Sequence, residues 1–174
     1  HVRHISTIEQ YAPSPLFVHI VRDGREVVAS IEDRARKHPE SFGGQGVQYG
    51  VQLWNECIEH TKSHRRKENH RIVRYEDLVE ETDTMMEDLC RFIGFHYEPE
   101  IKENRAANPD QYILPSEEWK EKVTRPIQKT PSKFHRLFGA ERRNQIEQAL
   151  DLDSLDTVGP LRHVGSAPTT EVSR

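Results

Sequence analysis

The hydrophobic pattern of the chain changes its period at Arg22. Residues 16–21 are a short run dominated by apolar side chains, which predicts a buried strand. Apolar residues then recur at helical spacing and predict a helix over 24–37. Asp23 occupies the N-cap position of this helix, and Glu26 follows at the spacing of a capping box. The sequence therefore predicts a strand that enters a helix through a tight turn.

The remaining pattern predicts one more strand and several more helices. Helical spacing recurs in four further segments, and the second strand comes between two of them: helices at 1–11, 47–67, 84–94 and 139–150, and a strand at 71–75. Segment 39–46 and the stretch from Glu76 through Glu80 are predicted to be loops, and 97–130 short helices with long connections. Strands separated by helices predict an α/β domain with a parallel sheet flanked by helices. Residues 1–152 would form it, and residues 153–174 a poorly ordered tail.

The predicted turn after the first strand has the features of an anion site. Free backbone N–H groups and the positive end of the helix dipole meet there. Arg22 adds a planar cation suited to phosphate, and Ser30 lies two helical turns further along. Two simpler interpretations stay open: Arg22 could pair with a carboxylate such as Asp77, and Ser30 could bond to its own helix backbone.

Residues 22–30 resemble the 3′-phosphate-binding segment of sulfotransferases that use 3′-phosphoadenosine 5′-phosphosulfate (PAPS). That family has an apolar strand, then Arg-Asp-Pro/Gly-Arg-Asp/Glu-Val, and a Ser eight residues after the first Arg. Residues 71–79 resemble the family's strand that ends in Tyr-Glu-Asp-Leu. The resemblance implies that Arg22 and Ser30 hold the 3′-phosphate and that Tyr75 lies by the adenine. Without the resemblance, Tyr75 would be read as a half-buried core aromatic.

A looser match follows at Thr130-Pro-Ser-Lys-Phe, which is similar to the family's Ser-x-Gly-Arg-Trp. It implies that Thr130 and Lys133 also reach the 3′-phosphate. The resemblance implies a P-loop-NTPase-like fold, although the family's loop for the 5′-phosphosulfate, similar to Pro-Arg-Ser-Gly-Thr-Thr, has no counterpart in residues 1–174. We therefore expect an N-terminally incomplete domain, completed by a missing N-terminal segment or a complementing chain. The catalytic residues stay unassigned.

The expected activity is transfer of a sulfuryl group from PAPS to a hydroxyl or amine. Carbohydrate, lipid, small-molecule and peptide acceptors all stay open, because acceptor loops carry no recognisable code. One alternative is a non-catalytic half-domain that binds nucleotide or acts as a scaffold. Another is a relative of the P-loop kinases, which share the architecture.

Composition narrows the remaining classes of partner. The 174 residues fit one domain, and the net charge of −4 gives no general footprint for nucleic acid. No apolar run approaches the roughly 20 residues of a membrane span, so we expect a cytoplasmic protein. Cys57 and Cys90 are predicted to be buried free thiols. No metal is expected, because His60 and His64 share a helix face without a third ligand, and His19 reads as a hydrogen-bonded core residue.

Overall fold

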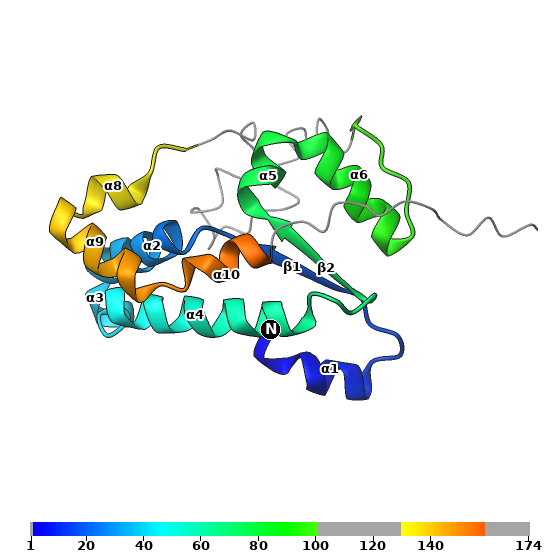
Figure 1. Ribbon diagram of the computed structural model, residues 1–174, viewed down its shortest axis with the longest axis horizontal. Coiled ribbons are helices and arrows are strands. Elements are labelled where there is room, and N and C mark those ends of the chain that lie inside the picture. Colours follow the sequence, from blue (N-terminus) through cyan, green and yellow to red (C-terminus); the bar gives the residue numbers. More distant parts are fainter. Residues whose placement is uncertain (1, 101–129, 159–174) are drawn as a thin grey trace, which may run out of the picture.

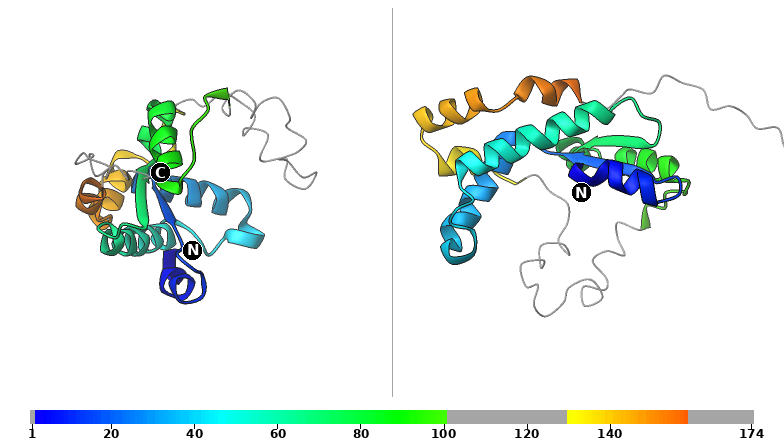
Figure 2. Two further views of the ribbon diagram at one scale, coloured as in Figure 1. Left: turned by 90° about the vertical axis from the view of Figure 1, so that its right-hand side faces the viewer. Right: turned by 90° about the horizontal axis from the view of Figure 1, so that it is seen from below.

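Two parallel strands form the centre of the fold, β1 (Phe17–Val21) and β2 (His70–Arg74). The computed structural model describes residues 2–100 and 130–158. In Figure 1 and in the left view of Figure 2, helices α5 (Tyr75–Glu80) and α6 (Thr82–Ile93) lie on one side of the strands, and α4 (Val47–His64) and α1 (Ile5–Tyr11) lie on the other. The predicted α/β class with a parallel sheet flanked by helices is confirmed.

The described residues form further helices. They are the 3₁₀ helix η1 (Val2–His4), α2 (Gly24–Lys37), α3 (Pro39–Phe42), α8 (Lys133–Leu137), α9 (Ala140–Ala149) and α10 (Leu152–Thr157). The predicted bounds of α2 are confirmed, and β1 begins one residue later than predicted. Gly94 ends α6 in the left-handed conformation with a φ of 85°, the conformation for which a glycine C-cap is favoured.

The hydrophobic core lies where α2 and α4 meet the C-terminal helices. Val28 of α2 is fully buried, and Gly50 of α4 brings the two helix backbones close together. A Cβ at Gly50 would lie 3.3 Å from the Val28 Cα atom. Phe134 of α8 and Ile146 of α9, exposed by 1% and 2%, close this core from the far end of the chain. Burial of these apolar side chains supplies the main driving force for this packing.

Several predicted elements differ from those observed. The segment after β2, predicted as a loop, is helix α5, and Pro39–Phe42 forms a single helical turn. Ile93 and Ala149 belong to the apolar positions of the predicted helices at 84–94 and 139–150, but both are exposed, Ile93 by 42%. Both stand at or next to a helix end, where the apolar stripe no longer faces the core.

The predicted domain boundary at residue 152 is too early. Helix α10 begins there, and Asp151 caps it by accepting a hydrogen bond from the Ser154 N–H at 3.3 Å. Leu155 and Val158 are 5% and 1% exposed and belong to the core. The described fold therefore continues to Val158, and the rest of the predicted tail lies outside the described residues.

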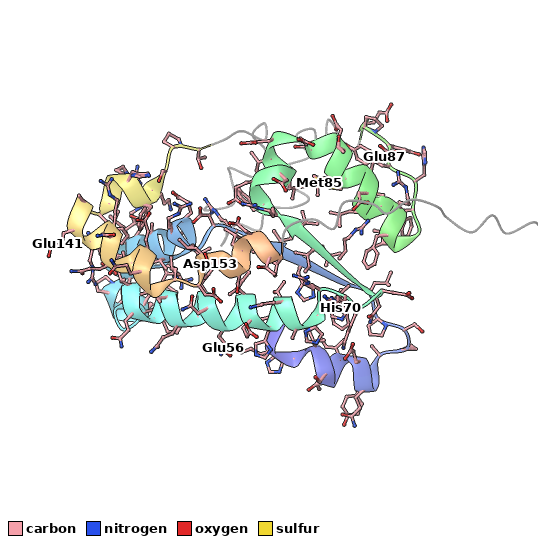
Figure 3. All side chains as sticks on the ribbon, in the orientation of Figure 1. Glu56, His70, Met85, Glu87, Glu141 and Asp153 are labelled. Atoms are coloured by element: carbon pink, nitrogen blue, oxygen red, sulfur yellow. The ribbon has the colours of Figure 1, made fainter. Side chains whose placement is uncertain are left out.

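A stack of histidines fills the amino end of the sheet, where His70 begins β2 (Figure 3). His19 Nε2 lies 2.8 Å from His70 Nδ1, and His19 Nδ1 lies 3.3 Å from Thr61 Oγ1. The His64 ring stacks on that of His70 with centroids 4.8 Å apart. Burial, with smaller repulsion from the other two rings, lowers the pKa of His19 to about 4. The predicted hydrogen-bonded core histidine is confirmed, and His64 joins this stack instead of a solvated face.

Two further expectations concern cysteines and membranes. Both cysteines are free thiols as predicted, with Cys90 buried but Cys57 only partly so. Within the described ranges, no group of three ligating side chains is arranged to hold a metal ion. None of the helices seen in this part of the chain has both the length and the apolar character that crossing a bilayer requires.

Candidate nucleotide-binding site

The strand register brings Arg22 and Tyr75 together. Val21 pairs with Arg74, so both strands finish at the same, carboxyl end of the sheet, where Arg22 begins a turn and Tyr75 begins α5. The Arg22 guanidinium carbon lies 4.7 Å from the centroid of the Tyr75 ring, a cation–π contact. Carboxyl ends of parallel strands are where open α/β sheets bind ligands. Two of the predicted site residues are thus in direct contact.

Helix α4 fixes the turn that carries Arg22. The Trp54 Nε1–H donates to the Arg22 carbonyl oxygen at 2.9 Å, and the Trp54 side chain is 5% exposed. Its ring lies directly against Gly24, where a Cβ would come within 2.8 Å of two ring carbons. Glycine is required here by this close approach. Trp54 therefore combines a place in the core with a hydrogen bond to the site.

The predicted capping box is only half formed. The Asp23 carboxylate accepts from the Arg25 N–H at 2.8 Å, as an N-cap does. The Asp23 N–H, however, donates to Glu76 Oε1 of α5 at 3.1 Å and not to the Glu26 carboxylate, as a complete capping box would require. Glu76 therefore connects the start of α5 to the start of α2. Burial opposes ionisation of Asp23, but the hydrogen bonds from Arg25 hold the pKa of its carboxyl below the ordinary value.

A cavity of about 210 Å³ opens beside Arg22 and Tyr75. Its wall combines these two residues with parts of α2, α5 and the segment before α8: Glu26, Glu76, Val79, Glu80, Thr130 and Ser132. An aromatic ring, a valine, a hydroxyl and an arginine are groups that can contact a base, a sugar and a phosphate. The structure thus places Arg22, Tyr75 and Thr130 in one cavity.

Ser30 and Lys133 line a second hollow, of about 230 Å³. Lys133 Nζ lies 3.3 Å from Asp33 Oδ2, so its ammonium is turned toward α2. Arg34 and Lys37 add two more cations to this hollow. The five predicted ligands are therefore divided between two hollows, and the Lys133 main chain, bonded to Glu26, connects them.

Buried polar atoms without a hydrogen-bond partner occur at the carboxyl end of the sheet. Arg22 Nε, Arg74 Nε and Glu76 Oε2 are buried and have no hydrogen-bond partner among the described residues. A buried N–H without an acceptor costs about 1–3 kcal/mol, so an arriving acceptor gains this much at Arg22. Three carboxylates, those of Glu26, Glu76 and Glu80, also line the cavity. An anion must therefore be held by directed donors, since the local charge alone does not attract it.

Comparison with known proteins decides the family. A family model described as "Sulfotransferase family" matches residues 1–99, more than half of the chain. This chain belongs to the sulfotransferase family. A 3-beta-hydroxysteroid sulfotransferase of Cavia porcellus is 36% identical over 73 residues, which is 42% of this chain and 25% of that protein. No solved structure gives a significant match.

The family match covers only part of the candidate site. Arg22, Ser30 and Tyr75 lie within the matched residues of this chain, whereas Thr130 and Lys133 lie beyond them. The matched stretch spans about a quarter of the length of the guinea-pig relative. The assignment of Thr130 and Lys133 therefore depends on where the fold brings them, next to Arg22 and next to Ser30 respectively. Sequence reasoning missed the contacts of Glu26 and Glu76 with other elements, because nothing in the sequence pairs them with distant backbone groups.

Proposed function

We propose that this chain forms the part of a sulfotransferase that binds the 3′-phosphoadenosine end of PAPS, for transfer of a sulfuryl group to a hydroxyl or amine acceptor. Arg22 carries the proposal. Its guanidinium stacks on the ring of Tyr75 at the carboxyl end of the strands, and its buried Nε lacks an acceptor among the described residues. A phosphate oxygen supplies such an acceptor, and charged hydrogen bonds of this kind are strong.

The other residues of the candidate site would contact different parts of the nucleotide. Tyr75 and Val79 offer an aromatic and an apolar surface for the adenine, and the Thr130 hydroxyl lies in the same cavity as Arg22. Ser30 and Lys133 would hold the far side of the 3′-phosphate from the neighbouring hollow. Bound PAPS supplies the activated sulfuryl group, and these residues bind and orient it without taking part in the transfer. Their selectivity would favour a 3′-phosphorylated nucleotide over ATP.

The groups that bind the 5′-phosphosulfate would come from a further polypeptide segment beside β1. Among the described residues β1 pairs only with β2, and its alternate side chains Leu16, Val18 and Ile20 are 50%, 43% and 60% exposed. Parallel sheets are normally covered on both faces, and two-stranded sheets are marginal alone. A segment that adds a strand beside β1 and packs over this face would cover these side chains and bring new residues to the same end of the sheet. A cytoplasmic location and the nature of the acceptor stay predictions.

Calorimetric titration with 3′-phosphoadenosine 5′-phosphate tests the proposal. We expect selective binding over ATP, and Arg22→Ala should weaken it by about 1.5–3 kcal/mol, the scale of a hydrogen bond to a charged group. Arg36→Ala is the matched control, because Arg36 lies on the same helix, is exposed and pairs only with Glu32 among the contacts described for it. Equal affinity for ATP would favour a P-loop kinase relative, and loss of binding in both variants would exclude a specific role for Arg22.

A further inference from the structure

Glu26 stands between the two groups expected to hold the 3′-phosphate. It lies one helical turn before Ser30 on the same face of α2, and four residues after Arg22, which precedes the helix. Its side chain is 19% exposed. A carboxylate at this place opposes the binding of a phosphate unless its own charge is satisfied by the protein.

The Glu26 carboxylate is satisfied by the segment that leads into α8. Oε1 accepts from Ser132 Oγ at 2.5 Å, and Oε2 accepts from the Lys133 N–H at 3.1 Å. Arg22 Nη2 lies 4.0 Å from Oε2. Lys133 is the first residue of α8, so its N–H has no acceptor within the helix and requires one from outside. Glu26 therefore caps a helix that is more than a hundred residues away in the sequence.

This contact fixes how far the α8 segment lies from Arg22. On its other side α8 is anchored by Phe134, which is 1% exposed in the core. The apolar anchor sets the depth of α8, while the carboxylate sets the position of the main chain from Thr130 to Lys133. Without Glu26, the Ser132 hydroxyl and the Lys133 N–H would lose this acceptor, and the contact of Lys133 Nζ with Asp33 would remain.

We propose that Glu26 is a positioning residue of the 3′-phosphate site. It acts through Ser132 and Lys133, and it seats the Thr130–Lys133 segment so that a phosphate can be held from α2 and from α8 at once. This inference rests on the proposed function. Glu26 does not bind the nucleotide, because two like charges in contact would repel each other.

The test compares the affinities of the full chain for 3′-phosphoadenosine 5′-phosphate and adenosine 5′-phosphate. The dissociation constant of adenosine 5′-phosphate divided by that of 3′-phosphoadenosine 5′-phosphate isolates the contribution of the 3′-phosphate, and this affinity ratio is the quantity compared between variants. Glu26→Gln keeps the size of the side chain but removes its charge and one acceptor oxygen. We expect it to lower the ratio about tenfold, the lower end of the range for a charged hydrogen bond, with binding of adenosine 5′-phosphate changed by less than about twofold.

Glu32→Gln is the matched control. Glu32 lies on the same helix, is 16% exposed, and accepts from the Val47 N–H at the start of α4 at 3.1 Å. It thus caps a distant helix in the same way but lines neither hollow of the candidate site. Its variant should lower the melting temperature about as much as Glu26→Gln and leave the ratio of affinities unchanged.

Each other outcome is decisive. Equal weakening for both nucleotides in Glu26→Gln would show a purely structural role, and tighter binding of the 3′-phosphorylated nucleotide would show that Glu26 competes with the phosphate. Either result overturns the inference. If Glu26→Gln does not fold, Ser132→Ala removes the partner hydroxyl instead and should lower the ratio, whereas an unchanged ratio would again overturn it. A wild-type chain that fails to distinguish the two nucleotides would reject the proposed function itself.

Discussion

The two ends of the β1–β2 sheet are built from opposite kinds of polar group. At the carboxyl end, Arg22 and Glu76 are charged, and each has a buried atom without a partner among the described residues. At the amino end, His19 and His70 are hydrogen bonded to each other and stack with a third imidazole. The same pair of strands thus has stacked imidazoles at one end, where His70 Nε2 is also buried without a hydrogen-bond partner among the described residues, and charged side chains around a cavity at the other. The groups that can contact a ligand lie at the carboxyl end.

The largest expected effect is acid destabilisation at the amino end. Because the folded-state pKa of His19 is about 4, against 6.5 in an unfolded chain, only the unfolded state takes up a proton between these values. This contribution to stability is full at pH 7, is lost as the pH falls from 6.5 to 4, and amounts to about 3 kcal/mol. Chemical denaturation at a series of pH values measures it.

His19→Gln separates this effect from that of other groups. Glutamine does not titrate, so the variant should lose less stability than the wild type over the same pH range. His70, whose pKa is also lowered mainly by burial, and the neighbouring His64, Glu9 and Lys67 remain in place in this variant. Parallel pH profiles for the variant and the wild type would contradict the comparison.

The next largest loss of stability is expected from overpacking near the carboxyl end of the sheet. A Gly24→Ala methyl would lie 2.8 Å from the Trp54 ring and 3.1 Å from a Leu150 methyl group. We expect a loss of about 1–3 kcal/mol of unfolding free energy. Gly139→Ala is a useful control, because among the described residues no heavy atom lies within 4 Å of the position that its Cβ would take. Equal losses for the two variants would show that the contact with Trp54 is not tight.

A smaller effect follows from the hydrogen bond between α4 and the site turn. Trp54→Phe removes the donor to the Arg22 carbonyl while keeping an aromatic ring against Gly24. The loss of one hydrogen bond should cost about 1 kcal/mol in urea denaturation, with some further loss from the smaller ring. If stability does not change, the Arg22 turn is held by Asp23 and Glu76 alone.

The smallest effect is expected at the periphery of the amino end. Arg3 donates to Glu56 at 2.7 Å, but both side chains are nearly half exposed. Arg3→Ala should change the unfolding free energy by no more than about 0.5 kcal/mol, because water and salt screen exposed ion pairs. A loss above about 1 kcal/mol would mean that η1 holds the histidine end in place.

Local sequence was enough to predict β1 and α2. The apolar run before Arg22, the cap at Asp23 and the cations at the end of the helix all act within one element, and they agree. The end of the helix at Gly94 was predicted for the same reason, since a left-handed cap depends on the residue itself. The family motifs also placed Arg22 and Tyr75 at the site, where the strand register brings them into contact.

Contacts between distant elements could not be predicted in this way. Glu26 has the spacing of a capping box, yet its carboxylate caps α8, while Glu76 binds the Asp23 N–H in its place. A single sequence shows that an acid is near a helix start but not which of several helix starts it will cap. Tyr75 was predicted to end a strand and the stretch from Glu76 through Glu80 to be a loop, but together they form α5, which contacts β2 and α6. The division of Ser30 from Arg22 into separate hollows likewise depends on the position of α8.

The bond from Trp54 to the Arg22 carbonyl gives the molecule an optical reporter of its own. An indole emits at a wavelength and intensity that depend on its hydrogen bond and on nearby charges. Since the Trp54 ring touches Gly24 and its N–H holds the residue that faces the proposed nucleotide, any shift of this turn must change that emission. The chain has two tryptophans, so Trp54→Phe supplies the blank that isolates the signal. Occupancy of the cavity could then be followed in solution without attaching a dye.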